Sequence, residues 1–126
     1  MILIDSYGWI EYFSEGTLAA SYAPYVEKAN EENCLTPTIV VYEVYRKMKS
    51  LLGERKAIEA FSQMARTRIV ELTSDVSLKA ADISLSLKLG TADAIIVATA
   101  RECNAEIITS DKHLKAAEKV KFISKE

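Results

Sequence analysis

Short apolar runs alternate along this chain with longer stretches of helical periodicity. The apolar runs are typical of buried strands and lie at residues 2–5, 34–35, 69–72, 107–109 and 120–123. Continuous apolar runs, in contrast to strict alternation of apolar and polar residues, indicate parallel strands covered by helices on both faces. The pattern therefore predicts an α/β fold, a three-layer α/β/α sandwich with a parallel sheet of about five strands.

Helical patterns fill the intervals between these runs. We expect helices at residues 6–16, 18–29, 36–52, 54–66, 73–90, 91–100 and 112–119. Thr36 and Pro37 are typical of an N-cap and first-turn pair, and Thr91 is typical of another N-cap. Pro24 lies inside the second helical pattern and is expected to kink or split that helix.

Length and composition indicate one ordinary globular domain spanning 1–126. The chain has 126 residues, of which 49% are hydrophobic and 27% are charged. The longest apolar runs are far shorter than the roughly 18 residues of a membrane span. The chain enters a strand at once, without a basic leader or a cleavage site, so we expect no signal peptide and a cytoplasmic location. Cys34 and Cys103 lack metal-site spacing and are expected to be free thiols.

Four carboxylates lie against or inside these apolar runs: Asp5, Glu43, Asp93 and Asp111. An isolated ionised carboxylate is expensive to remove from water, so their placement suggests a positive partner, such as a pair of hard divalent cations. Ligands of open α/β sheets bind beyond the carboxyl ends of the strands, where the strand order reverses. Asp5 ends the first predicted strand, and Asp111 closely follows the fourth. We therefore expect the four acids to converge on one edge of the sheet.

The spacing of these acids in the sequence leaves other interpretations open. Three of the four fall at or near helix starts, where a carboxylate caps free N–H groups without any functional role. Glu43 lies about two turns into its helix, where it could reach solvent or pair with Lys47 at i+4. Asp75 also follows a strand and opens a helix, so spacing alone does not separate it from the four.

Four segments follow one another in order over nearly the whole chain: DSYGWIEYF at 5–13, TPTIVVYEVYRKM at 36–48, TADAIIVATA at 91–100 and IITSD at 107–111. They give the chain a resemblance to the PIN domain, and most closely to the VapC-type toxins of toxin–antitoxin modules. The resemblance implies that the acidic quartet of the family corresponds to Asp5, Glu43, Asp93 and Asp111. Asp75 and Asp82 match none of its members.

Two hydroxyl residues extend the resemblance, and one position departs from it. Ser6 falls where the family often has Ser or Thr after the first acid, and Thr109 matches a frequent Thr two residues before the last acid. Many members carry a further Asp or Asn two residues after the last acid, followed by Phe. This chain has His113 and Leu114 there, and imidazole suits softer metals than Mg²⁺.

The resemblance implies a metal-dependent endoribonuclease. Two Mg²⁺ or Mn²⁺ ions suit a site made only of oxygen ligands, and such a pair can hydrolyse phosphodiester bonds. Our hypothesis gives Asp5 and Asp93 direct contact with the principal ion. Asp111 and Glu43 would hold the second ion or its waters, and the two hydroxyl residues would orient carboxylates.

The resemblance also implies the substrate and the partners: RNA cut at single-stranded or loop sites, a cognate antitoxin protein, and a homodimer or higher homo-oligomer. The net charge is −2, but setting the four acids aside leaves 18 − 4 = 14 acids against 16 Lys and Arg, a slightly basic remainder that permits a polyanionic partner. Arg46, Lys47 and Lys112 lie near the acids in sequence and could bind phosphates, or could be solvated surface charges.

Two other functional classes stay open. A phosphatase or phosphotransferase could use Asp5 as a covalent nucleophile. Such phosphatases place a second Asp two residues later, where this chain has Tyr7. The third class is a non-catalytic PIN-like binding module, against which the complete set of four acids argues.

Overall fold

A five-stranded parallel sheet forms the centre of the fold. The computed structural model describes residues 1–124 and orders the strands β3-β2-β1-β4-β5. The strands are β1 (Ile2–Ile4), β2 (Cys34–Pro37), β3 (Arg68–Val70), β4 (Glu106–Thr109) and β5 (Val120–Phe122). The central strand β1 pairs with β2 and β4, and Leu3 lies opposite Leu35 and Ile107.

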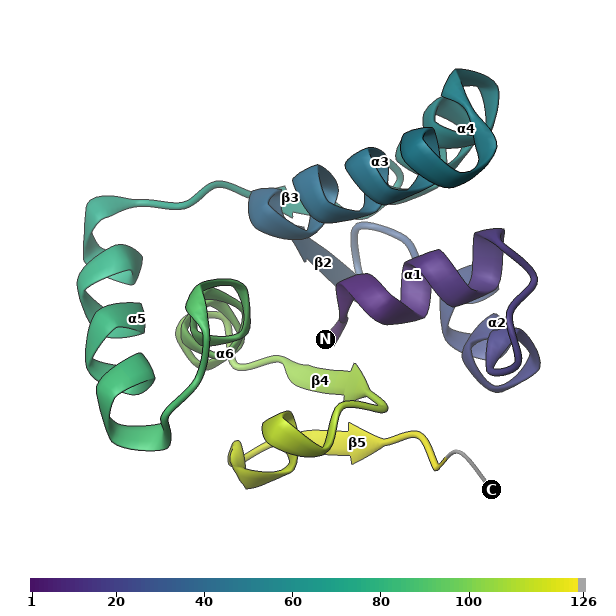
Figure 1. The fold of residues 1–126 in the computed structure, drawn as a ribbon. Helices are drawn as coiled ribbons and strands as arrows, with labels where there is room; N and C mark the ends of the chain where they lie inside the picture. The colour runs from purple at the N-terminus through teal and green to yellow at the C-terminus, as the bar shows by residue number, and fades with distance from the viewer. Residues whose placement is uncertain (125–126) are drawn as a thin grey trace.

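Helices cover both faces of this sheet. They are α1 (Ser6–Phe13), α2 (Ala19–Lys28), α3 (Thr38–Leu52), α4 (Glu54–Met64), α5 (Ser74–Leu87), α6 (Thr91–Glu102) and the short 3₁₀ helix η1 (Lys112–Ala116). Helices α1 to α4 lie on one side of the sheet, and α5 and α6 lie on the other (Figure 1). The predicted three-layer α/β/α sandwich with a parallel sheet is confirmed.

The start of α3 differs from the prediction. Thr36 does not cap this helix but lies inside β2, where it pairs with Ile69 of β3 and its hydroxyl oxygen lies 2.6 Å from that of Thr67. Pro37 is the N-cap, and the helix begins at Thr38. The partners that hold Thr36 in the sheet are more than thirty residues away, so local capping statistics did not identify them.

Two further helix predictions also need correction. Thr91 is the first residue of α6, and Gly90 is its N-cap. The helix α2 continues through the exposed Pro24 to Lys28, so the proline does not split it. Most other differences shift an element's end by a few residues: the strand expected at 69–72 is observed at Arg68–Val70, and the helix expected at 112–119 is the shorter η1.

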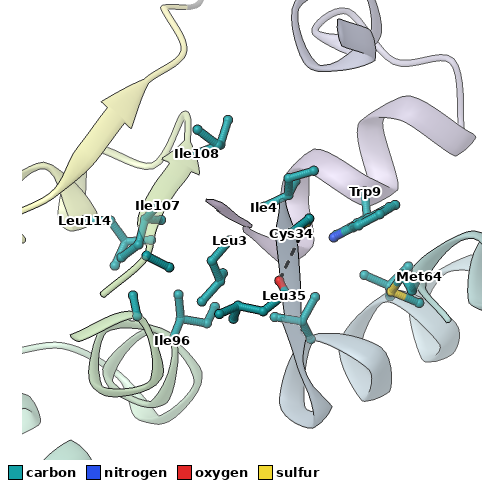
Figure 2. Packing of buried hydrophobic residues seen from close by; sticks show 14 of the residues in the cluster. Leu3, Ile4, Trp9, Cys34, Leu35, Met64, Ile96, Ile107, Ile108 and Leu114 are labelled. Atoms are coloured by element: carbon teal, nitrogen blue, oxygen red, sulfur yellow. Dashed lines mark hydrogen bonds between the residues drawn. The ribbon is translucent and has the colours of Figure 1, made fainter. Parts of the chain in front are cut away.

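Buried aliphatic side chains on both faces of β1 and its neighbours form the core. Trp9 and Met64 pack on the side of α1 and α4, whereas Ile96 and Leu114 pack on the opposite side (Figure 2). All four are at most 2% exposed. This packing holds the carboxyl ends of β1 and β4 in fixed positions.

Both cysteines are free, as expected. Cys34 is buried in β2 and Cys103 is partly buried after α6. Burial raises the pKa of the Cys34 thiol to about 12, so it stays protonated and unreactive near neutral pH.

Within residues 1–124, no single helix is long and apolar enough to cross a membrane. Helices α5 and α6 meet the length and hydropathy requirement only as a pair bent by 116°.

The position of Leu3 in the central strand leads to a stability prediction. Leu3 is fully buried, so Leu3→Ala should lower the free energy of unfolding by about 2–5 kcal/mol through lost burial and a residual cavity. Leu85 is 82% exposed on α5, and Leu85→Ala should change it by no more than about 0.5 kcal/mol. Urea unfolding of both variants measures the difference. Equal losses would contradict this description of the core.

Candidate active site

A cleft opens where the strand order reverses, at the carboxyl ends of β1 and β4. These neighbouring strands are connected to the rest of the sheet in opposite directions, which creates the ligand-binding crevice of open α/β folds. The cleft has a volume of about 530 Å³. Its walls are formed by Asp5, Ser6, Tyr7, Glu43, Asp93, Ile96, Ser110, Asp111 and Lys112.

The four acids singled out in the sequence all line this cleft, and each comes from a different element. Asp5 follows β1, Glu43 lies in α3, Asp93 lies in the first turn of α6, and Asp111 follows β4. Asp5 and Asp111 also cap α1 and η1, accepting hydrogen bonds from backbone N–H groups at 2.9 and 2.8 Å. Helix capping and membership of the cluster are therefore compatible for these two residues.

Asp5 is the most constrained of the four acids. Its side chain is only 4% exposed, and both carboxylate oxygens accept hydrogen bonds. Oδ2 accepts from Thr109 Oγ1 at 2.6 Å, while Oδ1 accepts from Gly8 N at 2.9 Å and from the Tyr22 hydroxyl at 3.3 Å. Burial outweighs these donors and raises the pKa of Asp5 from 3.8 to about 6, with a smaller contribution from the charge of Asp111.

Glu43 faces the cleft and is held there by Ser6. The Ser6 hydroxyl donates to Glu43 Oε1 at 2.6 Å. The alternative partner at i+4, Lys47, is exposed and forms no ion pair with Glu43 in the described structure. The contact with Ser6 therefore takes the place of the helical ion pair that spacing left open.

Asp93 lies close to two of the other acids. Partial burial is the largest cause of its raised pKa. The negative charges of Asp111 and Glu43, and a hydrogen bond with Asp111, raise the pKa further. This contact favours the protonated form of Asp93, because two neighbouring carboxyl groups cannot both ionise cheaply at short range. The cleft thus concentrates negative charge that a cation would relieve.

The two other aspartates considered lie elsewhere. Asp75 is exposed on α5 and forms an ion pair with Lys79 at 2.9 Å. Asp82 is also exposed on α5. Neither lines the cleft. The fold therefore separates Asp75 from the four acids, which spacing alone did not.

Only one of the three basic residues proposed to bind phosphate lines the cleft. Lys112 lines the cleft beside Asp111. Arg46 and Lys47 are exposed on α3 and do not line it, because they lie a turn beyond Glu43. The His113 side chain is 83% exposed, and its Nδ1 lies 3.1 Å from Asp111 Oδ1.

Tyr22 and Ser110 also belong to this region, although their positions in the sequence did not predict it. Ser110 lines the cleft, and Tyr22 reaches Asp5 from α2 beneath it. Tyr22 has the apolar periodicity of an ordinary core residue, which concealed this contact. The available signal was Gly8, a glycine inside a helix that leaves room for a large side chain nearby.

Comparison with known proteins establishes the family. The sequence model of the PIN domain matches residues 2–120. The chain belongs to the PIN domain family. No curated protein matches it significantly in sequence.

Solved structures of three bacterial proteins share this PIN fold. A toxin–antitoxin complex from Klebsiella pneumoniae has a TM-score of 0.79 at 22% identity, covering 100% of this chain and 98% of the other. VapC20 of Mycobacterium tuberculosis, a toxin that cleaves the sarcin–ricin loop, has a TM-score of 0.80 at 17% identity, covering 95% and 97%. VapBC2 of Rickettsia felis, bound to a promoter DNA fragment, has a TM-score of 0.77 at 16% identity, covering 97% and 98%.

The donor chemistry of this PIN domain's cleft fits a hard divalent cation, because the four acids offer only oxygen ligands. Within residues 1–124, however, no three Asp, Glu, His or Cys side chains are grouped closely enough to form a completed ligand set. Asp5 and Glu43 instead accept hydrogen bonds from protein groups. A bound cation would complete the set by drawing Asp93 and Asp111 toward the carboxylates of Asp5 and Glu43.

The buried Asp5 should make the metal-free protein less stable as pH rises. Its pKa is about 6 in the folded state and 3.8 when unfolded, so the folded protein holds more protons between these values. Stability therefore falls from about pH 4 to pH 6 and then levels off, by a loss on the order of 3 kcal/mol. Asp93, whose pKa is also raised, should add in the same direction.

Urea unfolding of wild type and Asp5→Asn in EDTA, between pH 4 and 8, measures this contribution. Asparagine carries no titrating proton. As the pH rises across this range, the variant should therefore gain stability relative to the wild type. A difference that is constant with pH would contradict the raised pKa of Asp5.

Proposed function

We propose that this PIN domain is a metal-dependent endoribonuclease of the VapC type and the toxin of a toxin–antitoxin module. The observation that carries the proposal is the convergence of Asp5, Glu43, Asp93 and Asp111, from four elements, in one cleft at the strand-order reversal. Four acids in one crevice are costly for stability. A site that binds cations explains why the chain places them together.

The reaction proposed is hydrolysis of RNA phosphodiester bonds. When bound, two Mg²⁺ or Mn²⁺ ions would supply an activated water and neutralise the charge of the phosphate oxygens. Asp5 and Asp93 would hold the principal ion, and Asp111 and Glu43 the second ion or its waters. The low exposure of Asp5 would keep bulk water away from one side of the principal site.

Residues around the acids would orient them and bind the substrate. The hydroxyls of Thr109 and Ser6 donate at 2.6 Å to Asp5 and Glu43, which limits the rotation of both carboxylates. Lys112, at the rim of the cleft, would attract the RNA backbone to the scissile position. Arg46 and Lys47 would contact phosphates farther along the strand, if the RNA follows α3.

The structural relatives support the proposed substrate and partner. One of them cleaves the sarcin–ricin loop, and another is a toxin–antitoxin complex. We therefore propose a structured or looped cellular RNA as substrate, a cognate antitoxin as inhibitor, and a cytoplasmic location. Leu52, Ile58 and Phe61 are 48%, 51% and 42% exposed on the contacting helices α3 and α4, and this apolar surface supports the proposed homodimer.

The contacts of Asp5 give no support to a phosphatase. A covalent nucleophile must present an oxygen to the substrate, but both Asp5 oxygens accept hydrogen bonds and the side chain is 4% exposed. A non-catalytic binding module makes a different prediction, since it needs no cation. Calorimetric titration with Mg²⁺ or Mn²⁺ separates this possibility from the nuclease.

Cleavage of an RNA panel tests the proposal directly. The wild-type protein should cut at discrete sites with Mg²⁺ or Mn²⁺, leave 5′-phosphate ends, and lose activity in EDTA. Asp93→Asn should lower the rate by about 100-fold or more, because it removes a proposed cation ligand from the cleft.

Asp75→Asn is the matched control, because it removes the same charge from an exposed ion pair on α5. Its cleavage rate should stay within about twofold of wild type, as expected for an exposed ion pair. Equal activity of Asp93→Asn and wild type, in folded protein, would rule out the proposed site. Failure of the wild type to cleave any RNA with either metal would rule out the nuclease.

A further inference from the structure

Tyr22 connects the helix α2 to the acidic cleft from the side opposite to solvent. Its side chain is fully buried, and its hydroxyl lies 3.3 Å from Asp5 Oδ1 and 3.1 Å from Ser110 Oγ. We infer that Tyr22 is a positioning residue that holds the Asp5 carboxylate in the orientation needed for cation binding. This inference rests on the proposed function.

The glycine at position 8 gives independent support for this role. A Cβ atom at Gly8 would lie 2.4 Å from Cε1 and 2.6 Å from Cδ1 of Tyr22, far inside van der Waals contact. It would also lie 2.9 Å from Cγ2 of Ile4. Glycine weakens a helix interior, yet α1 has one here. Its absent side chain is what lets the Tyr22 ring pass beneath α1 to Asp5.

The hydroxyl group is not needed to fill this space, because a phenylalanine ring would occupy nearly the same volume. A buried hydroxyl costs free energy unless it is hydrogen-bonded. The Tyr22 hydroxyl has one proton, which Asp5 can accept, and the Ser110 hydroxyl can then donate to the tyrosine oxygen. Asp5 follows the central strand β1, and Ser110 follows β4. One phenol group therefore links the two strand ends that carry Asp5 and Asp111.

Together with its neighbours, Tyr22 fixes both oxygens of Asp5. Thr109 contacts Oδ2, while Gly8 N and the Tyr22 hydroxyl contact Oδ1. Thr109 and Gly8 approach from residues next to the cleft, whereas Tyr22 approaches from the core. Loss of the Tyr22 hydroxyl should leave Gly8 N as the remaining donor to Oδ1, which loosens the orientation of the carboxylate without changing the number of acids in the cleft.

Tyr22→Phe tests this inference with two measurements: Mn²⁺ affinity by calorimetry, and kcat and KM on an RNA that the wild type cleaves. We expect the Mn²⁺ dissociation constant to rise and kcat to fall, each by about tenfold or more, because partners that orient metal ligands have effects of this size. KM for RNA should change little, since Tyr22 is fully buried and does not line the cleft. Circular dichroism should be that of the wild type.

Tyr12→Phe is the matched control. It removes a tyrosine hydroxyl that donates to Glu27 at 2.9 Å, away from the cleft. Its Mn²⁺ affinity and kcat should equal those of the wild type. A folded Tyr22→Phe protein with wild-type Mn²⁺ affinity and kcat would overturn the inference and leave Tyr22 as a core residue only.

Failure of the proposed function would look different. A wild type that binds Mn²⁺ but cleaves no RNA, with affinity still weakened in Tyr22→Phe, would support the inference and overturn the nuclease. If Tyr22→Phe does not fold, Ser110→Ala decides, because it removes the other partner of the hydroxyl. Mn²⁺ affinity lowered by about threefold or more, the size of one lost hydrogen bond, supports the inference, and wild-type affinity overturns it.

Discussion

Burial of the Asp5 carboxylate at the end of the central strand is the constraint on which the site depends. Taking a carboxylate out of water is costly, and the raised pKa of Asp5, about 6, reflects that cost. Donors from three parts of the chain offset it: α1 through Gly8, α2 through Tyr22 and β4 through Thr109. Because these partners span positions 8 to 109, Asp5 is held in place only when β1, β4 and both helices are assembled.

The other three acids add to the same electrostatic cost. Asp93 lies near Asp111 and Glu43, and its raised pKa has burial as the first cause and their charges as the next. A fold selected for stability alone would replace or separate such groups. In the proposed nuclease, their convergence is a stability cost accepted for function, as is common where an active site is built into a small domain.

Much of the fold could be predicted because its signals are local. Continuous apolar runs identified the parallel strands, and Asp5 and Asp111 could be placed at a common edge from their positions after strands. What failed depended on distant partners. Thr36 has the local signature of a helix cap, but its pairing with β3 keeps it in the sheet.

The same limit applies to the site itself. The contact between Tyr22 and Asp5 joins residues 17 positions apart and has no periodic signature. Arg46 and Lys47 have nearly the helical phase of Glu43, yet one turn of helix, about 5.4 Å, takes them past the cleft. Sequence spacing predicts well which face of a helix a residue lies on. Whether that residue also reaches a site along the helix axis is known only once the helix is packed into the fold.

Counting the protons released when Mn²⁺ binds tests most directly whether the four carboxylates form a cation site. Calorimetry at pH 6 in buffers of different ionisation enthalpy gives this number. Asp5 and Asp93 have raised pKa values, so they hold protons that a cation must displace. The predicted result is saturable Mn²⁺ binding with release of roughly one proton. This proton release should be lost in the Asp93→Asn protein. Two results would contradict a cation site in this cleft. One is absence of Mn²⁺ binding, and the other is Mn²⁺ binding that releases no proton and has the same affinity in the Asp93→Asn protein.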